Sequence, residues 1–426
     1  MSQPTKILIV GASIAGPMAT YFLSKLPNST ITIIERHPSF RPGGQNVDIR
    51  TAGVTVMRRI PGMEEMVRER MIHLHAFQLV GNDGKVFASM KTSGNAEQQS
   101  LVSEFEIFRD ELSRILFELT EREENVEYVF GEEVAALHQG VERGEKKVTV
   151  EFRNGKLPTG EYDLVVACDG TNSKTRAMGF GCGVRDHVLP LNAWAAYFSV
   201  EKDYVDGERV GRMHTSVGGR SLACGPTLST GNRVTAFAVH PRHDKESMGL
   251  FRAAQKAGDD ALKEYVARHF KGTGWHSDEI LESMMRSTDF YASEWAQVKV
   301  PKLYNGRVVL VGDAGYAAGP TGGGTSLAMT GGYFLAGEIC EGGGDIDAGL
   351  EAYEKRMAPI IADLQKIPPG IPGIMAPQTR WGIWLRNIIF VLITWSSGFF
   401  GWLSKQFASS FGKDKYGLPD YKWKRV

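Results

Sequence analysis

The sequence predicts an α/β fold, in which a Rossmann-like nucleotide-binding domain carries an inserted, mostly antiparallel β-sheet domain and C-terminal helices. Three observations predict it. Residues 6–35 follow a strand–glycine turn–helix–strand pattern, residues 185–300 contain segments of alternating polarity, and residues 306–340 return to an apolar strand, a glycine-rich loop and a helix. The expected division is 1–184 and 301–365 for the nucleotide-binding domain, 185–300 for the second domain, and 366–426 for an apolar helical region.

The bulk composition is that of a globular protein with two closely packed domains. The chain has 426 residues, of which 42% are apolar and 23% charged. Lys and Arg number 49 and so do Asp and Glu, so the overall charge does not indicate a nucleic-acid-binding protein. The four cysteines form no CxxC pair, and no metal-ligand pattern is complete. They indicate free thiols in a reducing compartment, so we expect a cytoplasmic protein.

The first strand and turn carry the strongest local signal. Lys6–Val10 is typical of a buried parallel strand, Gly11 permits a tight turn, and Gly16 lets the helix approach the sheet. Backbone N–H groups between the glycines face a pyrophosphate in such units. Glu35 ends the second strand about 20 residues later, where a ribose hydroxyl needs an acceptor. Ser13 replaces the usual middle glycine. The alternative is a βαβ turn that binds nothing.

Three arginines are candidates for ligand contact, and the loop with the first two would suit a second part of the same ligand. Arg36 and Arg41 flank a loop rich in Pro and Gly, for which the alternative is an ordinary solvated connection. Arg109 stands at the start of a predicted helix, where a cation opposes the helix dipole and indicates an external anion or polar ligand. The alternative is a surface pair with Glu106 or Asp110.

The rest of the chain is expected to contain further strands and helices, and two of its buried strands are followed by an acid and a glycine. Strands are expected at 126–130 and 162–168, hairpins at 74–90 and 134–153, and a helix with a break at 55–70. Asp169-Gly170 and Gly312-Asp313 each follow a buried strand. The second domain has strands at about 193–200, 211–216, 221–226 and 233–240, with helices at about 247–255 and 261–269.

Three motifs therefore stand in order: the glycine turn with Glu35, Asp169-Gly170, and Gly312-Asp313 before a Pro-Gly-rich loop. Together they resemble the FAD-dependent aromatic hydroxylase-type monooxygenases, the group of p-hydroxybenzoate hydroxylase. The loop at 43–50, GGQNVDIR, looks more like the branch that contains the tetracycline-inactivating monooxygenases and many natural-product tailoring enzymes. The resemblance spans about residues 5–360.

The resemblance implies a glutathione-reductase-like domain along which FAD lies extended. It assigns the pyrophosphate to Gly11, Ser13, Ala15 and Gly16, the adenosine ribose to Glu35 and the adenine to the backbone of Val134. It assigns Asp313 to the ribityl chain, Arg109 to the ribityl or phosphate region, and Asp169 to both FAD and NAD(P)H. It assigns the flavin pyrimidine to the Pro320–Thr325 loop, including Gly323, Gly324 and Thr325. Arg36 and Gln45 are further candidates for FAD contact.

Candidate catalytic residues lie near the expected flavin edge or on the second sheet. A phenol substrate needs a base or a hydrogen-bond acceptor, and each candidate has a purely structural role as its alternative. The candidates are Asp48, Arg50, Tyr197, Arg212 and His214, with Pro320 as the residue that rigidifies the loop over the flavin. Relatives usually carry histidine where this chain has Tyr316, a position expected near the isoalloxazine.

The implied activity is an FAD-dependent monooxygenation with NAD(P)H as a transient co-substrate. Through a C4a-hydroperoxyflavin, O2 would hydroxylate or epoxidise a hydrophobic or aromatic small molecule, in secondary-metabolite biosynthesis. Alternatives are a degradative aromatic hydroxylase, a flavin oxidoreductase or halogenase of the same fold, and a non-catalytic flavin-binding protein. A WxWxIP-type halogenase motif is absent from the sequence. The expected state is a monomer or a homodimer.

The apolar stretch Trp381–Leu403 has three interpretations. It is long enough to cross a bilayer, but Arg386 lies inside it. The interpretations are a helix packed across the two domains, peripheral membrane attachment, and a transmembrane span.

Overall fold

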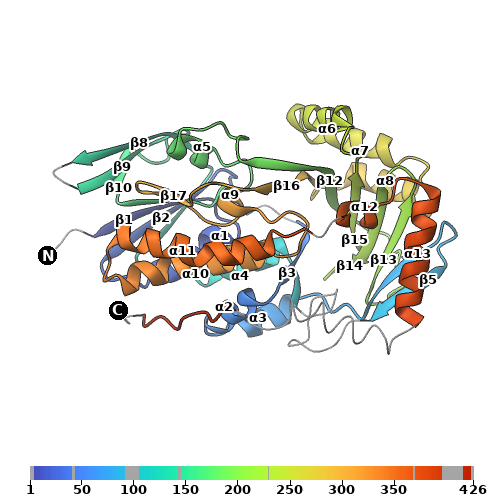
Figure 1. The fold of residues 1–426 in the computed structure, drawn as a ribbon, viewed down its shortest axis with the longest axis horizontal. Coiled ribbons are helices and arrows are strands. Elements are labelled where there is room, and N and C mark those ends of the chain that lie inside the picture. The colour runs from blue at the N-terminus through green and yellow to red at the C-terminus, as the bar shows by residue number, and fades with distance from the viewer. Residues whose placement is uncertain are drawn as a thin grey trace.

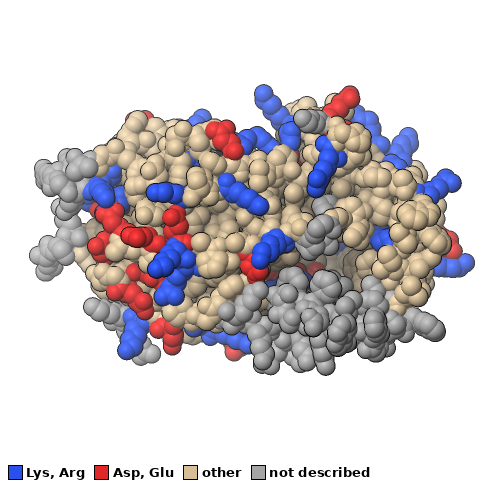
Figure 2. Space-filling view, viewed as in Figure 1, with Lys and Arg blue, Asp and Glu red and all other residues tan. Residues whose placement is uncertain are grey.

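A computed structural model describes residues 4–40, 44–91, 105–142, 145–228, 230–367, 370–395 and 416–423. Figure 1 shows two bodies side by side, each built around one large sheet. Figure 2 shows basic side chains spread over the whole visible face, whereas most of the acidic ones lie over the first body.

The first body contains a six-stranded sheet in the order β17-β18-β11-β1-β2-β7. Neighbouring strands are parallel, except for the antiparallel pair β17–β18. The strands are β1 (Thr5–Val10), β2 (Ser29–Glu35), β7 (Val126–Phe130), β11 (Leu164–Ala167), β17 (Tyr304–Asn305) and β18 (Val308–Leu310). The predicted α/β architecture is confirmed.

Helices and a small sheet cover the two faces of this sheet. Helices α1 (Ala15–Leu23) and α10 (Gly324–Glu341) pack on the face that carries Ile7 and Ile9. Leu8 and Val10 point to the other face, against the small sheet. That sheet comprises β8 (Val134–Glu142), β9 (Glu145–Phe152) and β10 (Gly160–Tyr162). Burial on both faces explains why β1 is apolar throughout.

The other elements of the first body surround the ends of its strands. A two-stranded ribbon pairs β3 (Asn46–Ile49) with β6 (Phe105–Phe108). The predicted helix with a break at Pro61-Gly62 is realised as two helices, α2 (Ala52–Arg58) and α3 (Met63–Arg70). The other helices of this body are α4 (Arg109–Glu118), α5 (Lys174–Phe180), α9 (Asp313–Tyr316) and α11 (Ile346–Leu364).

The second body is a seven-stranded sheet in the order β16-β12-β15-β14-β13-β4-β5. Its strands are β4 (Ala76–Val80), β5 (Val86–Lys91), β12 (Val188–Val200), β13 (Val210–Ser216), β14 (Arg220–Pro226), β15 (Asn232–Val239) and β16 (Tyr291–Val298). One face is covered by α6 (Lys245–Ala257), α7 (Asp259–Phe270) and α8 (Ser277–Arg286). The β4–β5 hairpin falls within the range expected for the first domain, but β4 pairs in parallel with β13 and so belongs to this sheet.

The C-terminal region contributes to both bodies. Helices α12 (Ile371–Met375) and α13 (Arg380–Trp395) lie in the second body, where α13 packs on β5 and β13. No helix in the described ranges is long and apolar enough to cross a membrane. Residues 396–403 of the apolar stretch lie outside those ranges. Residues 416–423 form no helix, in contrast to the prediction, and place Leu418 and Tyr421 in the core of the first body.

Candidate cofactor and active site

The predicted glycine turn has the close backbone approaches that exclude side chains. Gly11 has a φ of +109°, and a Cβ there would lie 2.6 Å from the carbonyl oxygen of Cys168. A Cβ on Gly16 would lie 1.9 Å from the carbonyl oxygen of Gly11. Glu35 reaches back to this turn, where its Oε2 accepts a hydrogen bond from the Ala12 N–H at 3.0 Å. The βαβ unit therefore brings its glycines and its acid together, as predicted.

The second motif packs directly on the first. A Cβ on Gly312, whose φ is +69°, would lie 2.8 Å from the Ala15 Cβ. A Cβ on Gly332 would lie 2.8 Å from the Ala19 nitrogen, so α1 and α10 pack backbone to backbone. Neither helix has a side-chain hydrogen bond that caps its N-terminus. Two helix N-termini with free N–H groups next to each other favour binding of an anion.

Arg109 joins three separate segments at this place. Its Nε donates to the Ser13 Oγ at 3.1 Å, and its backbone N–H donates to the Gln45 carbonyl at 3.1 Å. Its charge also acts on Asp313, where it opposes the burial that raises the pKa of that carboxyl. Arg109 thus points to the glycine turn, and its contact with an anion or polar ligand stays a prediction. Ser13 uses its hydroxyl to hold this arginine beside the glycine turn.

Unsatisfied polar groups near Arg109 fit a polar ligand. The Gln45 Oε1 and the Asn46 Oδ1 are buried without a hydrogen-bond partner in the described residues. Asp313 is an exposed side chain, yet the protein around it is dense enough to raise its pKa. Buried polar atoms without a partner are costly, so these groups fit the donors and acceptors of FAD.

The glycine loop before α10 meets the predicted catalytic pair. Arg50 forms an ion pair with Asp48 at 2.7 Å, and its backbone N–H donates to the Ser326 Oγ at 3.0 Å. A Cβ on Gly322 would lie 3.4 Å from the Asp48 Oδ2. Pro320 is partly buried at the start of this loop, and Thr325 is buried in the first turn of α10. The structure thus brings together Asp48, Arg50 and the 320–325 loop.

Glu106 is a site residue that the sequence did not reveal as one. It stands opposite Asp48 in the β3–β6 ribbon, and its Oε1 accepts from the Asn46 Nδ2 at 2.8 Å. Burial, and then the Asp48 charge, raise the pKa of Glu106 to about 7. Burial likewise raises the pKa of Asp48, against the effect of Arg50. The alternating pattern of both strands was a signal, but their pairing joins segments about 60 residues apart.

The sheet face opposite the helices is apolar and aromatic. Tyr197, Met213, Phe237 and Trp295 lie on it and pack with residues of α12 and the segment after it, Met375 and Ala376. The rings of Phe237 and Trp295 stack with centroids 5.4 Å apart.

One arginine links this face to the first body. Arg233 Nη2 donates to the carbonyl oxygen of Gly44 at 2.7 Å. Tyr197, a predicted candidate, lies near Arg109 and Arg233, whose charges act on its hydroxyl, but burial prevails and raises its pKa to about 12. This sheet face therefore adjoins the segment that precedes Asp48.

Two predicted candidates lie on the other face of the sheet. His214 is buried, with Nδ1 3.3 Å from the Val80 carbonyl and Nε2 3.1 Å from the Thr273 carbonyl. Burial lowers its pKa despite these two acceptors. Arg212 forms ion pairs with Asp206 and Glu208. Both residues therefore have partners within the second body, on the side of the sheet that the helices cover, away from Asp48.

The Tyr316 side chain points into the interior of the protein. The side chain is 1% exposed in the core of the first body, and its hydroxyl lies 3.0 Å from that of Tyr353. Gly331 of α10 leaves room for the Tyr316 ring, and the expected proximity of this position to the isoalloxazine stays a prediction.

The remaining predicted contacts have well-defined surroundings. The Asp169 carboxylate accepts from the Ser173 hydroxyl and from the Thr175 N–H at 3.1 Å, so it fixes the loop before α5. Arg36 is exposed, and Val134 is buried at the start of β8. Contacts of these three residues with a nucleotide stay predictions. No group of three potential metal ligands occurs in the described ranges, and the four cysteines are free.

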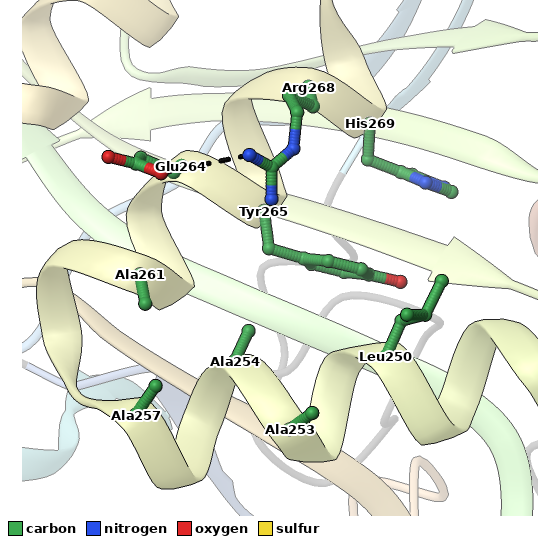
Figure 3. Close-up of a pocket in the computed structure, with 9 residues that line it drawn as sticks. All are labelled: Leu250, Ala253, Ala254, Ala257, Ala261, Glu264, Tyr265, Arg268 and His269. Atoms are coloured by element: carbon green, nitrogen blue, oxygen red, sulfur yellow. Dashed lines mark ion pairs between the residues drawn. The ribbon is translucent and has the colours of Figure 1, made fainter.

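A separate surface groove lies between α6 and α7. Figure 3 shows its walls, which are small apolar side chains with Tyr265 and Leu250 at one end. The ion pair between Arg268 and Glu264, at 3.6 Å, is its charged feature. This groove lies on the helical side of the second sheet and offers none of the chemistry found around Asp48.

Comparison with known proteins identifies the cofactor family. Residues 4–366 match the family model described as "FAD binding domain". The chain belongs to this family. The FAD-dependent monooxygenase asL6 of Sarocladium schorii is 32% identical over 407 residues, covering 91% of this chain and 92% of the relative. Monooxygenase CTB7 of Cercospora beticola is 28% identical and covers 99% of this chain and 98% of its own.

Solved structures agree on the fold. The tetracycline destructase Tet(51) superposes with a TM-score of 0.75 at 24% identity, covering 99% of this chain and 100% of its own. Klebsiella pneumoniae HpxO, complexed with FAD and uric acid, gives a TM-score of 0.68 at 18% identity and covers 96% and 97%. The resemblance to the FAD-dependent aromatic hydroxylase type is thus confirmed, and the protein is a flavin-dependent monooxygenase of this family.

Proposed function

We propose that this monooxygenase uses NAD(P)H and O2 to hydroxylate or epoxidise a hydrophobic or aromatic small molecule of secondary metabolism. One observation carries the proposal. Arg109, which contacts the first glycine turn and whose charge acts on Asp313, adjoins an aromatic sheet face through Gly44, whose carbonyl accepts from Arg233. Its fungal relatives include monooxygenases named asL6 and eupH.

The residues present would hold FAD in an extended form. The free N–H groups of α1 and Gly11–Gly16 would bind the pyrophosphate, and Asp313 with Arg109 would bind the ribityl chain. The α10 N-terminus would stabilise negative charge on the flavin ring without reorganisation. When bound, the flavin would supply the redox chemistry, because it can react with reduced nicotinamide and with dioxygen. The protein would orient the reactants and exclude water.

Asp48, Arg50 and Glu106 would hold the polar end of the substrate. Arg50 keeps Asp48 oriented, while Glu106 lacks an ion-pair partner in the described residues and keeps its proton up to about pH 7. A protonated carboxyl can donate to a substrate oxygen, and its ionised form can accept a phenol proton. The apolar body of the substrate would lie against Tyr197, Phe237 and Trp295.

The test uses the purified full-length protein. We expect a yellow protein with bound FAD that oxidises NADPH or NADH faster when the right phenolic or polyketide-like substrate is present. Mass spectrometry should show a product heavier by one oxygen atom, which comes from labelled dioxygen. A protein that cannot be loaded with FAD, or a product without the label, would contradict the proposal. Uncoupled oxidation of NAD(P)H with every substrate would favour the flavin oxidoreductase alternative.

A further inference from the structure

Helix α13 turns apolar side chains to solvent and its central charged residue, Arg386, toward the protein. Trp381, Trp384, Leu385 and Ile389 are 67%, 56%, 37% and 47% exposed. Their spacing of three and four residues places them on one side of the helix. Arg386, in contrast, is 6% exposed. This polarity is the reverse of that of an ordinary surface helix.

The orientation of α13 is fixed by the hydrogen bonds of Arg386. Its Nη1 donates to the Thr215 Oγ1 at 2.8 Å and to the Met375 carbonyl at 3.2 Å, and its Nη2 donates to the Asn387 Oδ1 at 2.7 Å. Rotating the helix to bury its tryptophans would break the bonds to Thr215 and Met375, which lie outside α13. The apolar face is therefore held outward by the fold. Ile374 on α12, 50% exposed, adds to the exposed apolar surface of this region.

The sequence around α13 is strongly biased toward positive charge. No acidic residue occurs between Asp363 and Asp414, although the whole chain has equal numbers of acidic and basic residues. The same interval contains five basic residues, Lys366, Arg380, Arg386, Lys405 and Lys413, of which Arg386 is buried and the last two lie outside the described residues. An apolar helix face within a cationic segment is complementary to an apolar layer below an anionic surface.

We propose that the exposed face of α13, defined by Trp381, Trp384, Leu385 and Ile389, docks on an anionic lipid bilayer. Indole rings suit the headgroup boundary because they have an apolar body and a polar N–H. A symmetric contact with a second copy would bring two cationic segments together, which the charge pattern disfavours. Because the opposite side of α13 packs on β5 and β13, the contact is peripheral.

The location of α13 suggests what the docking is for, and this step rests on the proposed function. The residues before α13, Met375 and Ala376, pack on the same sheet face as Phe237 and Trp295. Docking would place this side of the second sheet next to the lipid (Figure 1). The substrate would then be a lipophilic metabolite that partitions into the bilayer.

The experiment is flotation of the full-length, FAD-loaded protein with vesicles of phosphatidylcholine alone or mixed with phosphatidylglycerol. We expect binding to the mixed vesicles that weakens with added salt. The double variant Trp381→Ser/Trp384→Ser should bind about tenfold less. The matched control is Leu250→Ser on α6, an apolar residue 56% exposed, which should bind like the wild type. Flavin absorbance of each variant reports folding, and Ile389→Ser replaces the double variant if that loses its flavin.

Equal flotation of the wild type and the tryptophan variants would overturn the proposal. So would a wild type that stays off all vesicles, whether it is monomeric or forms a dimer that the tryptophan substitutions dissociate in sedimentation. The proposed function is judged separately, because NAD(P)H oxidation and product formation are measured without vesicles on the same preparations.

Discussion

Replacing Glu106 with glutamine should make the protein more stable at neutral and alkaline pH. In the native protein, burial and the facing Asp48 raise the pKa of Glu106 from 4.5 to about 7. This difference corresponds to about 3 kcal/mol of unfolding free energy. Glutamine has nearly the same shape but cannot ionise, so it removes this cost.

The sign follows from proton binding. Below about pH 4.5, Glu106 is protonated in both states and contributes no pH dependence. Between about pH 4.5 and 7 the native state holds a proton that the unfolded state has lost, so stability falls as pH rises. Above about pH 7 the destabilisation is complete. The stability difference between Glu106→Gln and wild type should therefore grow from near zero to as much as about 3 kcal/mol. The dependence of this stability difference on pH belongs to the Asp48–Glu106 pair and not to Glu106 alone, because the two carboxyls interact.

The assay is denaturant unfolding of the FAD-loaded protein, followed by circular dichroism at several values between about pH 5 and 8. Flavin content must be equal in all samples, since a bound ligand stabilises the native state. Glu65→Gln, at an exposed position on α3, is the control and should show no growing difference. A difference that stays constant over this range, or a variant less stable than wild type at about pH 8, would refute the reasoning.

Three further predictions concern binding and packing. Arg109→Ala should weaken FAD binding about tenfold to a hundredfold in a fluorescence titration, because the guanidinium that links Ser13 to the Asp313 region is lost; unchanged affinity would contradict this. Gly331→Ala should cost about 1–3 kcal/mol, since the new Cβ would lie 1.9 Å from the Tyr316 hydroxyl. Adding Tyr316→Phe should recover part of the loss, and strictly additive effects in thermal unfolding would argue against this contact. His214→Phe should lower the melting temperature but leave turnover per bound flavin nearly unchanged, whereas a loss of turnover alone would restore its catalytic role.

Much of the nucleotide-binding body was predictable because its signals are local. The strand, turn and helix at 5–23, and the strand ends that carry Asp169 and Gly312-Asp313, follow from runs of apolar residues and glycine positions. Gly11 and Gly16 are required by contacts within the same βαβ unit or with the adjacent strand. Short-range steric limits of this kind are readable from one sequence.

Pairing between segments that are distant in the sequence was harder to predict. The β4–β5 hairpin was predicted, but which sheet it joins depends on β13, more than 100 residues later. Glu106 became a site residue only through its register with Asp48. The alternation in β13 placed Arg212 and His214 on one face but did not tell which face the helices cover.

The sequence by itself determined the βαβ unit, because glycine turns and strand-end acids act within short stretches of chain, and the order of its three motifs gave the resemblance that implied the family and FAD. The tertiary structure decided how the candidate site is assembled: it brought Asp48, Arg50 and Glu106 together and turned Tyr316 into the core. It also decided that α13 holds Arg386 inward and Trp381 outward. The physical reason is that burial and electrostatics depend on neighbours that are distant in sequence, and only packing of the two sheets supplies those neighbours.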